Sequence, residues 1–423
     1  MKHRIATFHL LVPLAIIIGF SAFRFATVEQ PTTWGFFGHR KINRQAVFLL
    51  PPEMMVFFKK NIDFLTEHAV DPDKRRYASP YEAVRHYIDL DVYGEMPFEH
   101  VPRGWTDALI QYSDIYFMDK NRDTFQLLIK GANAAIQDSL GELALNPKLS
   151  NGGSPKVSYK DFRWFFINSF LPNFYEDNWT APCDSLGKLL NTTSDHITCE
   201  KLLAIDHLSE HGILPWHLQS MLRRLTSAFE EMDANKIRRH AADIGHYIAD
   251  AHVPLHTTEN YNGQLTGQDG IHAFWESRLP ELFADEEFDF WTGKAQFIEN
   301  PKDYFWNIVL ESHTLVDSVL AIELDLRHRF PSDQQMCHEM RGETLVRTQC
   351  TAYAAAYNER MGGMVERRMR DAILAVGSAW YTAWVLAGQP DLNLLEQEIV
   401  VVDSGDVGGL EGKKGLFRNW IHE

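Results

Sequence analysis

The sequence lacks several features that would assign it to a common class of protein. It has no low-complexity bulk, and 45% of its 423 residues are hydrophobic against 23% charged, so the chain can bury a core and is not intrinsically disordered. It also lacks positive charge, because 41 Lys and Arg face 57 Asp and Glu, which gives a net charge of −16. Such a field repels phosphates and excludes a broad electrostatic grip on nucleic acid or an anionic membrane. A phosphate-bearing substrate would need local cations to hold it.

Motifs for several other chemistries are also missing. No Gly-x-Ser-x-Gly nucleophile elbow occurs, and the glycine-rich stretch 151–156 lacks the Gly-Lys-Ser/Thr ending of a phosphate-binding loop. His338 and Glu339 are adjacent, but the second histidine of a His-Glu-x-x-His protease helix does not follow them. The sequence therefore gives little support to a serine nucleophile of this kind, to a nucleotide-binding phosphate loop or to a His-Glu-x-x-His protease.

Cysteine is scarce, and its spacing is informative. The four cysteines form two close pairs, Cys183 with Cys199 and Cys337 with Cys350, and neither pair has the Cys-x-x-Cys spacing of a zinc site. We therefore expect structural disulfides within these pairs rather than metal ligation, with two pairs of free buried thiols as the alternative. Disulfides of this kind are typical of proteins outside the reducing cytoplasm.

The N-terminal segment 1–33 also indicates export. A basic start precedes the apolar run Leu10–Phe23, which is the pattern of a secretory signal peptide. An uncleaved membrane anchor is the alternative interpretation, although the short run and Pro13 argue against a full span. We expect a secreted or periplasmic protein, with membrane anchoring through residues 10–23 as the other possibility.

Helical periodicity dominates the remainder of the chain. Apolar residues recur every three or four positions across 218–232 and 237–251, and helical patterns also cover about 36–50, 106–140, 303–325 and 351–388. We predict an all-α fold, with a single large multi-helix domain over 34–390 and a metal cluster in a cleft. Residues 391–423 are predicted to be an extension of uncertain order.

Two local predictions refine this picture. Ser79-Pro80-Tyr81-Glu82 has the form of a capping box, which predicts a helix through about Leu90. Segment 143–200 is rich in Asn, Pro, Ser and Gly, and it is predicted to form long loops between helices.

One stretch of the sequence concentrates metal-ligand side chains. His246 and Asp250 are four residues apart on an expected helix, so both project from one face, and Asp243 lies one turn earlier. Pro254 is expected to end that helix and to let His256 turn into a position that an unbroken helix would not provide. Asp243 is expected to orient His246 from outside the ligand shell.

A second stretch repeats the spacing. His272 and Glu276 are again four residues apart on an expected helix. A borderline-soft dication such as zinc takes this mixture of imidazole and carboxylate ligands. The two stretches together therefore predict a zinc site.

Three further candidates lie upstream. His86 belongs to the expected helix that follows Ser79, and an aspartate precedes it at position 71 or 73. Both Asp71 and Asp73 have a suitable separation from His86, and we prefer Asp73 slightly. Trp34 is followed closely by His39. Each of these fragments is weak evidence for a metal ligand when it is taken alone.

Together, and in this order, the motifs resemble those of the zinc-dependent phospholipase C and single-strand-specific nuclease superfamily, which consists of α-helical three-zinc phosphoesterases. The shared elements are a tryptophan with a histidine shortly after, an aspartate, a His-Tyr-Ile-Asp-like segment, His-Tyr-x-x-Asp-x-x-x-Pro-x-His and Gly-x-His-x-x-x-Glu. They run from Trp34 to Glu276, which is more than half of the chain.

The resemblance implies a set of two or three Zn²⁺ ions. One ion would be bound by His86, His246, Asp250 and the upstream aspartate, a second by His256, His272 and Glu276, and a third by His39, Asp250 and the amino and carbonyl groups of Trp34. The third ion requires cleavage that makes Trp34 the N-terminus.

Clustered zinc ions suit phosphodiester hydrolysis, because they make hydroxide available near neutral pH and neutralise charge on phosphoryl oxygens. Asp250, as a bridge between ions, and Asp73 are the expected catalytic carboxylates. The Gly-x-His-x-x-x-Glu context looks closer to the phospholipases, whereas the residues between His252 and His256 look closer to the nucleases.

We expect a phospholipase C-like hydrolase, with a secreted single-strand-specific nuclease as the alternative. A helical binding protein that zinc stabilises without turnover is a third possibility, from another class. The expected partner is therefore a phosphodiester substrate, either a phospholipid or a single-stranded nucleic acid. No obligate protein partner is indicated.

Overall fold

The computed structural model describes residues 36–129, 141–149, 153–174, 179–191, 199–341 and 344–395. The predicted signal peptide or anchor at 1–33, the candidate ligand Trp34 and residues 396–423 of the predicted extension lie outside these ranges. The described residues all belong to one compact unit.

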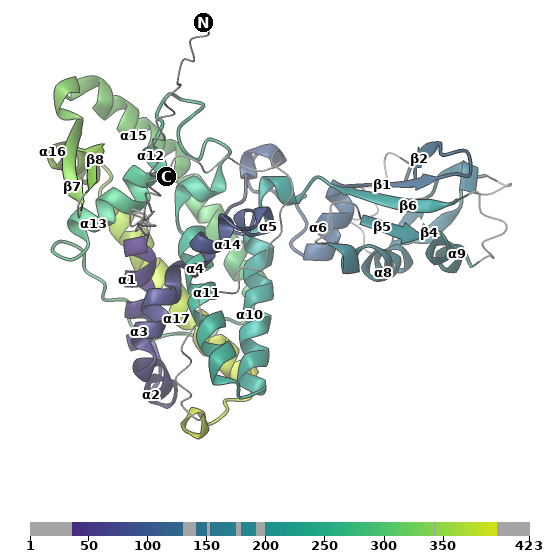
Figure 1. The fold of residues 1–423 in the computed structure, drawn as a ribbon, viewed down its shortest axis with the longest axis horizontal. Helices are drawn as coiled ribbons and strands as arrows, with labels where there is room; N and C mark the ends of the chain where they lie inside the picture. Colours follow the sequence, from purple (N-terminus) through teal and green to yellow (C-terminus); the bar gives the residue numbers. More distant parts are fainter. Residues whose placement is uncertain are drawn as a thin grey trace, which may run out of the picture. The chain divides into compact units, whose positions relative to one another are not determined.

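Three long helices and the first helix form the centre of the fold. α10 (Leu214–Glu230) is followed closely by α11 (Ala234–Ala251), and the two helices pack against each other and against α17 (Met364–Leu386) (Figure 1). α1 (Phe36–Ala46) contacts both α11 and α17. The side chain of Asp233 caps α11 by accepting hydrogen bonds from the backbone amides of residues 235 and 236. Trp380 of α17 is fully buried and donates its indole hydrogen to the carbonyl of Ala241, 3.0 Å away. This packing fixes α1 and α17 against the helix that carries His246 and Asp250.

Shorter helices surround this centre. They are α2 (Pro52–Lys60), α3 (Ile62–Glu67), α4 (Asp71–Arg76), α5 (Pro80–Ala83), α12 (Ile271–Ala273), α13 (Leu279–Phe283), α14 (Pro301–Thr314), α15 (Val316–Arg329) and α16 (Thr351–Arg360). None of the helices in the described part of the chain has both the length and the apolar character needed to cross a bilayer.

Three small antiparallel sheets correct the all-α prediction, although the fold is mostly helical. The largest has the strand order β2-β1-β6-β5, formed by β1 (Ser113–Met118), β2 (Thr124–Gln126), β5 (Trp179–Pro182) and β6 (Lys201–Asp206). β3 (Glu142–Ala144) pairs with β4 (Lys156–Ser158), and β7 (Met336–Arg341) pairs with β8 (Thr344–Gln349). Figure 1 shows α8 (Tyr159–Ser169) and α9 (Asp184–Leu190) beside the four-stranded sheet.

The predicted helix over 106–140 and the predicted long loops over 143–200 are therefore wrong in part. α6 (Trp105–Tyr112) ends where β1 begins, since β1 finds a pairing partner in β6, about 90 residues later in the chain. Within 143–200, the chain forms strands and two helices around a buried aromatic cluster that includes Phe166 and Trp179. Pairing with a distant strand overrides a weak local helical pattern.

The helix predicted from Ser79 through about Leu90 is also shorter than expected. α5 spans only Pro80–Ala83, and the Ser79 side chain makes no capping hydrogen bond. Backbone bonds to other segments replace helical ones, as Ile88 donates to the carbonyl of His256 at 2.9 Å and Ile213 donates to that of Val84 at 2.7 Å. The segment that carries His86 is therefore held by tertiary contacts.

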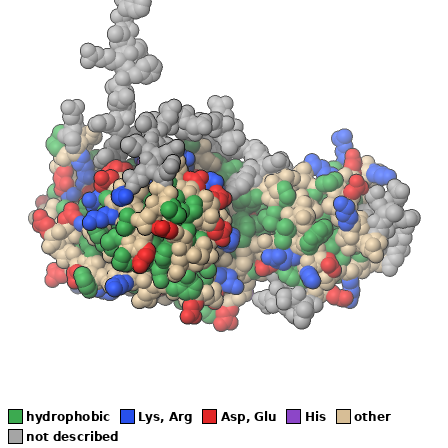
Figure 2. All heavy atoms as spheres, turned by 90° about the horizontal axis from the view of Figure 1, so that it is seen from below, with side chains coloured by type: hydrophobic (Ala, Val, Ile, Leu, Met, Phe, Trp, Pro, Cys, Tyr) green, Lys and Arg blue, Asp and Glu red, His purple; other side chains and the backbone are tan. Residues whose placement is uncertain are grey.

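Both expected disulfides are present, and the described chain has no free cysteine. Cys183, which directly follows β5, is bonded to Cys199, which lies just before β6, and Cys337 is bonded to Cys350 at the base of the β7–β8 hairpin. Figure 2 shows acidic and basic side chains interspersed over the visible face of the molecule.

Candidate metal centre

The predicted ligand side chains converge on one buried place from six segments of the chain. α11 contributes His246 and Asp250, and it ends at Ala251, ahead of Pro254 as expected. α1 contributes His39, α4 contributes Asp73, and the segment after α5 contributes His86. His256 comes from the 3₁₀ turn Pro254–Thr257, and His272 and Glu276 come from the place where α12 meets a π-helix. Apart from the partly exposed Glu276, each is at least nine-tenths buried.

These residues form overlapping groups with the geometry of metal sites. Among the described residues, donor atoms lie within 4.8 Å of one another in each of the triads His39–Asp73–His246, His86–His246–Asp250, His256–His272–Glu276 and His39–Asp250–Glu276. We call His86–His246–Asp250 the first triad and His256–His272–Glu276 the second triad. Asp250 links them, because its two carboxylate oxygens face different partners.

Backbone carbonyls fix the ring orientation of three of the histidines. The Nδ1 hydrogen of His246 is donated to the carbonyl of Ala69 at 2.8 Å, and that of His256 to the carbonyl of His86 at 2.6 Å. His272 donates from Nδ1 to the carbonyl of Tyr261 at 3.3 Å. A carbonyl oxygen only accepts, so Nδ1 carries a hydrogen in each ring and Nε2 is the atom that is left to bind a cation. This is the usual arrangement around a histidine that binds a metal.

The Nε2 lone pairs point at carboxylate oxygens. The Nε2 atom of His272 lies 2.8 Å from Oε2 of Glu276, and that of His256 lies 3.4 Å from the same oxygen. The Nε2 atom of His246 lies 3.3 Å from Oδ2 of Asp250. Two lone pairs at these distances repel unless a proton or a metal ion lies between them, so the donor set fits a metal ion.

His39 and His86 complete the cluster. Nε2 of His39 lies 3.3 Å from Oε1 of Glu276 and 3.5 Å from Oδ1 of Asp250, while its Nδ1 is buried and has no hydrogen-bond partner among the described residues. Nδ1 of His86 lies 2.9 Å from Oδ2 of Asp250 and 3.0 Å from Nε2 of His246. Burial first, and then the positive charges of neighbouring groups, lower the pKa of His86 well below its ordinary value, which keeps the ring neutral and able to bind a metal.

The three carboxyl groups of the cluster ionise differently. Burial, with the negative charges of Asp73 and Glu276, raises the pKa of Asp250 from 3.8 to about 7. Burial opposes ionisation of Asp73 too, but the guanidinium of Arg76 and the nearby histidines outweigh it and lower the pKa of that carboxyl. Hydrogen bonds from three histidines likewise outweigh burial at Glu276 and lower its pKa well below its usual range. A metal ion would relieve the cost of burying Asp250 as a carboxylate.

The structure separates the two aspartates that the sequence left open. Asp73 faces the cluster, with its oxygens 4.0 Å from Nε2 of His39 and 3.8 Å from Nε2 of His246. Asp71 instead accepts hydrogen bonds from His68 at 2.5 Å and from Lys74 at 2.9 Å, so it belongs to no ligand group.

The expected role of Asp243 is wrong. Its carboxylate binds the guanidinium of Arg75 at 3.0 Å, and the partner that orients His246 is the carbonyl of Ala69. The candidate ligand Trp34 lies outside the described residues.

Sequence reasoning missed one charged residue beside the cluster. A guanidinium nitrogen of Arg76 lies 3.5 Å from Oδ1 of Asp73, and its side chain is only 7% exposed. Arg76 follows Asp73 by one helical turn on α4, so the i, i+3 spacing within Asp73-Lys74-Arg75-Arg76 was the signal that could have indicated it.

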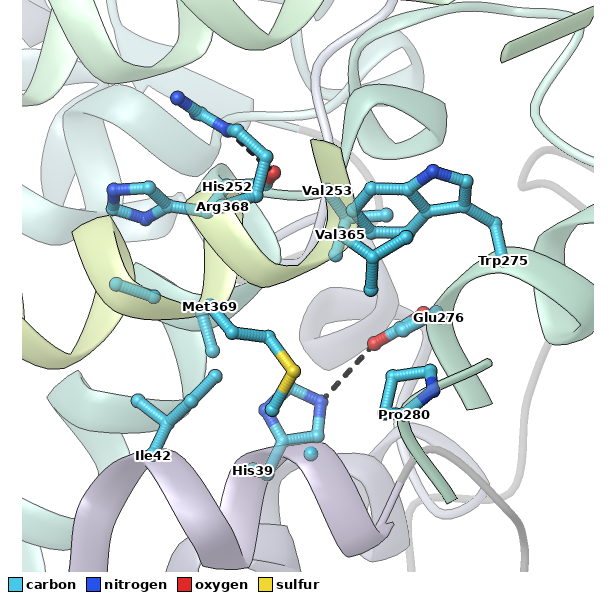
Figure 3. A pocket seen from close by; sticks show the side chains of 13 residues that line it. His39, Ile42, His252, Val253, Trp275, Glu276, Pro280, Val365, Arg368 and Met369 are labelled. Atoms are coloured by element: carbon cyan, nitrogen blue, oxygen red, sulfur yellow. Dashed lines mark hydrogen bonds and ion pairs between the residues drawn. The ribbon is translucent and has the colours of Figure 1, made fainter. Parts of the chain in front are cut away.

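A small cavity adjoins the cluster next to His39 and Glu276. Its volume is about 30 Å³, enough for a methyl-sized group. Figure 3 shows its mostly apolar walls, which include Ile42, Val365 and Met369. His252 lies on the far side of this cavity with its ring bonded to the carbonyl of Ile248, as expected for a structural histidine.

Comparisons with known proteins add no assignment to this geometry. A scan against protein-family models found no match, and a search of curated proteins found no significant match.

Proposed function

We propose that the protein is a zinc-dependent phosphodiester hydrolase of the phospholipase C type. The observation that carries the proposal is the orientation of His246, His256 and His272, whose Nδ1 hydrogens go to backbone carbonyls while their Nε2 lone pairs meet carboxylate oxygens. Burying such a set is costly without cations and favourable with them. The sequence resemblance to the three-zinc phosphoesterases points to the same chemistry.

The proposed ligand sets follow from the distances. His86, His246, Asp250 and Asp73 would hold one zinc ion, and His256, His272 and Glu276 a second. A third ion would lie between His39 and Asp250, with Trp34 as a further proposed ligand. Eight side chains shared among two or three ions leave coordination positions for water and substrate, as catalytic zinc sites require.

The reaction follows from charge and from the direction of the side chains. Bound zinc ions would lower the pKa of a water molecule and neutralise charge on the phosphoryl oxygens. Asp250 presents one oxygen to each side of the cluster, which fixes the separation of the two ligand sets. Arg76 holds Asp73 in place and supplies a fixed positive charge next to it, where an anionic phosphoryl group would be stabilised.

The choice of phospholipid over nucleic acid rests on the surroundings of the cluster. A polynucleotide needs cations along several phosphates, whereas the chain carries a net charge of −16 and the cavity next to Glu276 has mostly apolar walls. A phospholipid needs only one phosphate to be held by the cluster. The two disulfides support a proposed site of action in an oxidising compartment outside the cytoplasm.

The test is a parallel hydrolysis assay of the zinc-loaded protein on phosphatidylcholine vesicles and on single-stranded DNA, with an Asp250→Asn variant as the control. We expect release of phosphocholine by the wild type and none by the variant. Release of nucleotides with intact lipid would favour the nuclease instead. Hydrolysis of neither substrate, although zinc is bound, would favour a helical protein that zinc merely stabilises.

A further inference from the structure

A buried network of side chains lies behind the first triad and contains no proposed ligand. Its centre is Glu82 of α5, which is 4% exposed. The Glu82 carboxylate accepts hydrogen bonds from the hydroxyl of Tyr247 and from Arg85, and Arg75 lies 3.6 Å away. Arg75 in turn binds Asp243 of α11 at 3.0 Å.

We propose that Glu82 is a positioning residue that sets the geometry of both triads through the segment that carries His86. This inference rests on the proposed metal-binding function. The hydrogen bonds of Glu82 go to Tyr247 and Arg85 and not to a proposed ligand side chain, so Glu82 acts on the ligands through other residues.

The network joins the three segments that supply the first triad and Asp73. Arg75 lies two residues after Asp73 on α4, Glu82 lies four residues before His86, and Tyr247 directly follows His246 on α11. The buried Glu82 carboxylate accepts a hydrogen bond from one segment and lies beside an arginine of another, so it holds the segments in one arrangement. Loss of any of these interactions would leave a buried polar group unpaired.

α5 needs such an external support. It is a single turn of four residues without a side-chain cap, and short helices of this kind are not stable by themselves. The ring of Tyr247 lies edge-on to the ring of His86, with centroids 5.2 Å apart, so the hydroxyl bond to Glu82 also fixes one wall against which His86 rests.

His86 passes this constraint to the second triad. Its side chain faces Asp250 and His246, while its backbone carbonyl accepts the Nδ1 hydrogen of His256 at 2.6 Å. The amide of Ile88 returns a bond to the carbonyl of His256 at 2.9 Å. A displacement of the His86 segment therefore moves a ligand of the first triad and the orienting partner of a ligand of the second.

The test is a zinc titration of Glu82→Gln and of Tyr247→Phe in competition with a chelator, which gives the number of bound ions and the affinity of each. Loss of an outer-shell partner weakens metal binding by roughly 10- to 100-fold. We expect a loss of that size for Glu82→Gln at both triads, and a smaller loss in the same direction for Tyr247→Phe. The absorption spectrum of the cobalt-substituted protein should change in both variants, since the ligand geometry changes.

A matched control lies between α6 and α8. Asp107 accepts hydrogen bonds from Tyr159 at 2.6 Å and from Arg163 at 2.7 Å, which repeats the tyrosine–carboxylate–arginine arrangement away from the ligand residues. Asp107→Asn and Tyr159→Phe should alter the unfolding temperature and leave the zinc affinity and the cobalt spectrum unchanged.

The outcomes separate two kinds of failure. If the wild type binds no zinc, the proposed function itself fails. If the wild type binds zinc and Glu82→Gln binds it with unchanged affinity, or loses affinity at one triad alone, the inference about Glu82 is wrong. Should Glu82→Gln fail to fold by circular dichroism, Tyr247→Phe decides, because it removes a single hydroxyl and keeps the ring that packs against His86.

Discussion

Replacement of Asp250 by asparagine should raise the free energy of unfolding of the metal-free protein and lower that of the zinc-bound protein. Asp250 is 1% exposed, and its carboxyl pKa is raised from 3.8 to about 7 by burial and by the neighbouring carboxylates. In the unfolded chain this carboxyl has its ordinary pKa, so the folded state binds more protons between about pH 4 and pH 7. The free energy of unfolding therefore falls as pH rises through that interval.

The magnitude follows from the pKa difference. A carboxyl pKa that rises from 3.8 to about 7 costs on the order of 4 kcal/mol of stability at pH 8, because a tenfold change in an equilibrium constant is worth about 1.4 kcal/mol. Asparagine carries no charge to bury, so Asp250→Asn should recover much of this, about 2 to 4 kcal/mol, at pH 8. At pH 4, where the wild-type carboxyl is protonated, the two proteins should differ little.

The assay is urea unfolding at pH 4 and pH 8, with a chelator and with excess zinc. With zinc the order should reverse, since a ligand that binds only the folded state stabilises it in proportion to the logarithm of its affinity. Asp73→Asn is the control, because the Asp73 pKa is lowered rather than raised, so its loss should destabilise the metal-free protein at pH 8. If metal-free Asp250→Asn is no more stable than the wild type at pH 8, the reasoning about the buried carboxylate is refuted.

Three further predictions concern the stability of the folded protein. The buried ring of His217 has a pKa well below its ordinary value, first because of burial, so as pH drops from 7 to 5 it opposes the gain in stability that comes from Asp250. In urea unfolding, His217→Leu should therefore gain stability relative to the wild type over that interval, and a difference between the two proteins that does not change with pH would contradict this. In Gly245→Ala the new Cβ would lie 2.0 Å from Oδ1 of Asn43, so we expect a loss of about 2 kcal/mol by thermal unfolding, and an unchanged unfolding temperature would be the opposing result. Replacement of Cys337 and Cys350 by serine should cost about 2 to 4 kcal/mol in urea unfolding, and an unchanged midpoint would argue against a stabilising role for that disulfide.

The sequence predicted those parts of the fold in which apolar spacing is long and regular. The patterns over 218–232 and 237–251 correspond to α10 and α11, and those over 303–325 and 351–388 correspond to α14 to α17. Such helices are stabilised by burial of one face, so apolar residues at a spacing of three and four positions mark the face that packs on the core.

The strands were missed because their signals are short and depend on distant partners. β1 has six residues and pairs with β6, whose residues lie far along the chain. The capping-box prediction at Ser79 failed for a related reason, since Glu82 turns away from the helix start and binds Tyr247 and Arg85. Local propensity is a weak guide where tertiary hydrogen bonds are available.

The part of the candidate site on residues 246–276 was predicted from spacing within each segment, whereas His39, Asp73 and His86 were assigned to it through the family resemblance. The pairs four apart, such as His272 with Glu276, were found because helical geometry brings them together. The choice between Asp71 and Asp73 required the tertiary structure, since both separations from His86 were acceptable and only the fold shows which carboxylate faces the cluster. The role of Glu82 had no sequence signal beyond a capping pattern.

The central claim is that the buried histidines and carboxylates hold zinc ions. The most direct measurement is anomalous X-ray scattering at the zinc absorption edge from crystals of the zinc-loaded protein. We expect one anomalous peak among His86, His246 and Asp250, and a second among His256, His272 and Glu276. The absence of both peaks in crystals where the eight side chains keep the arrangement described above would contradict it.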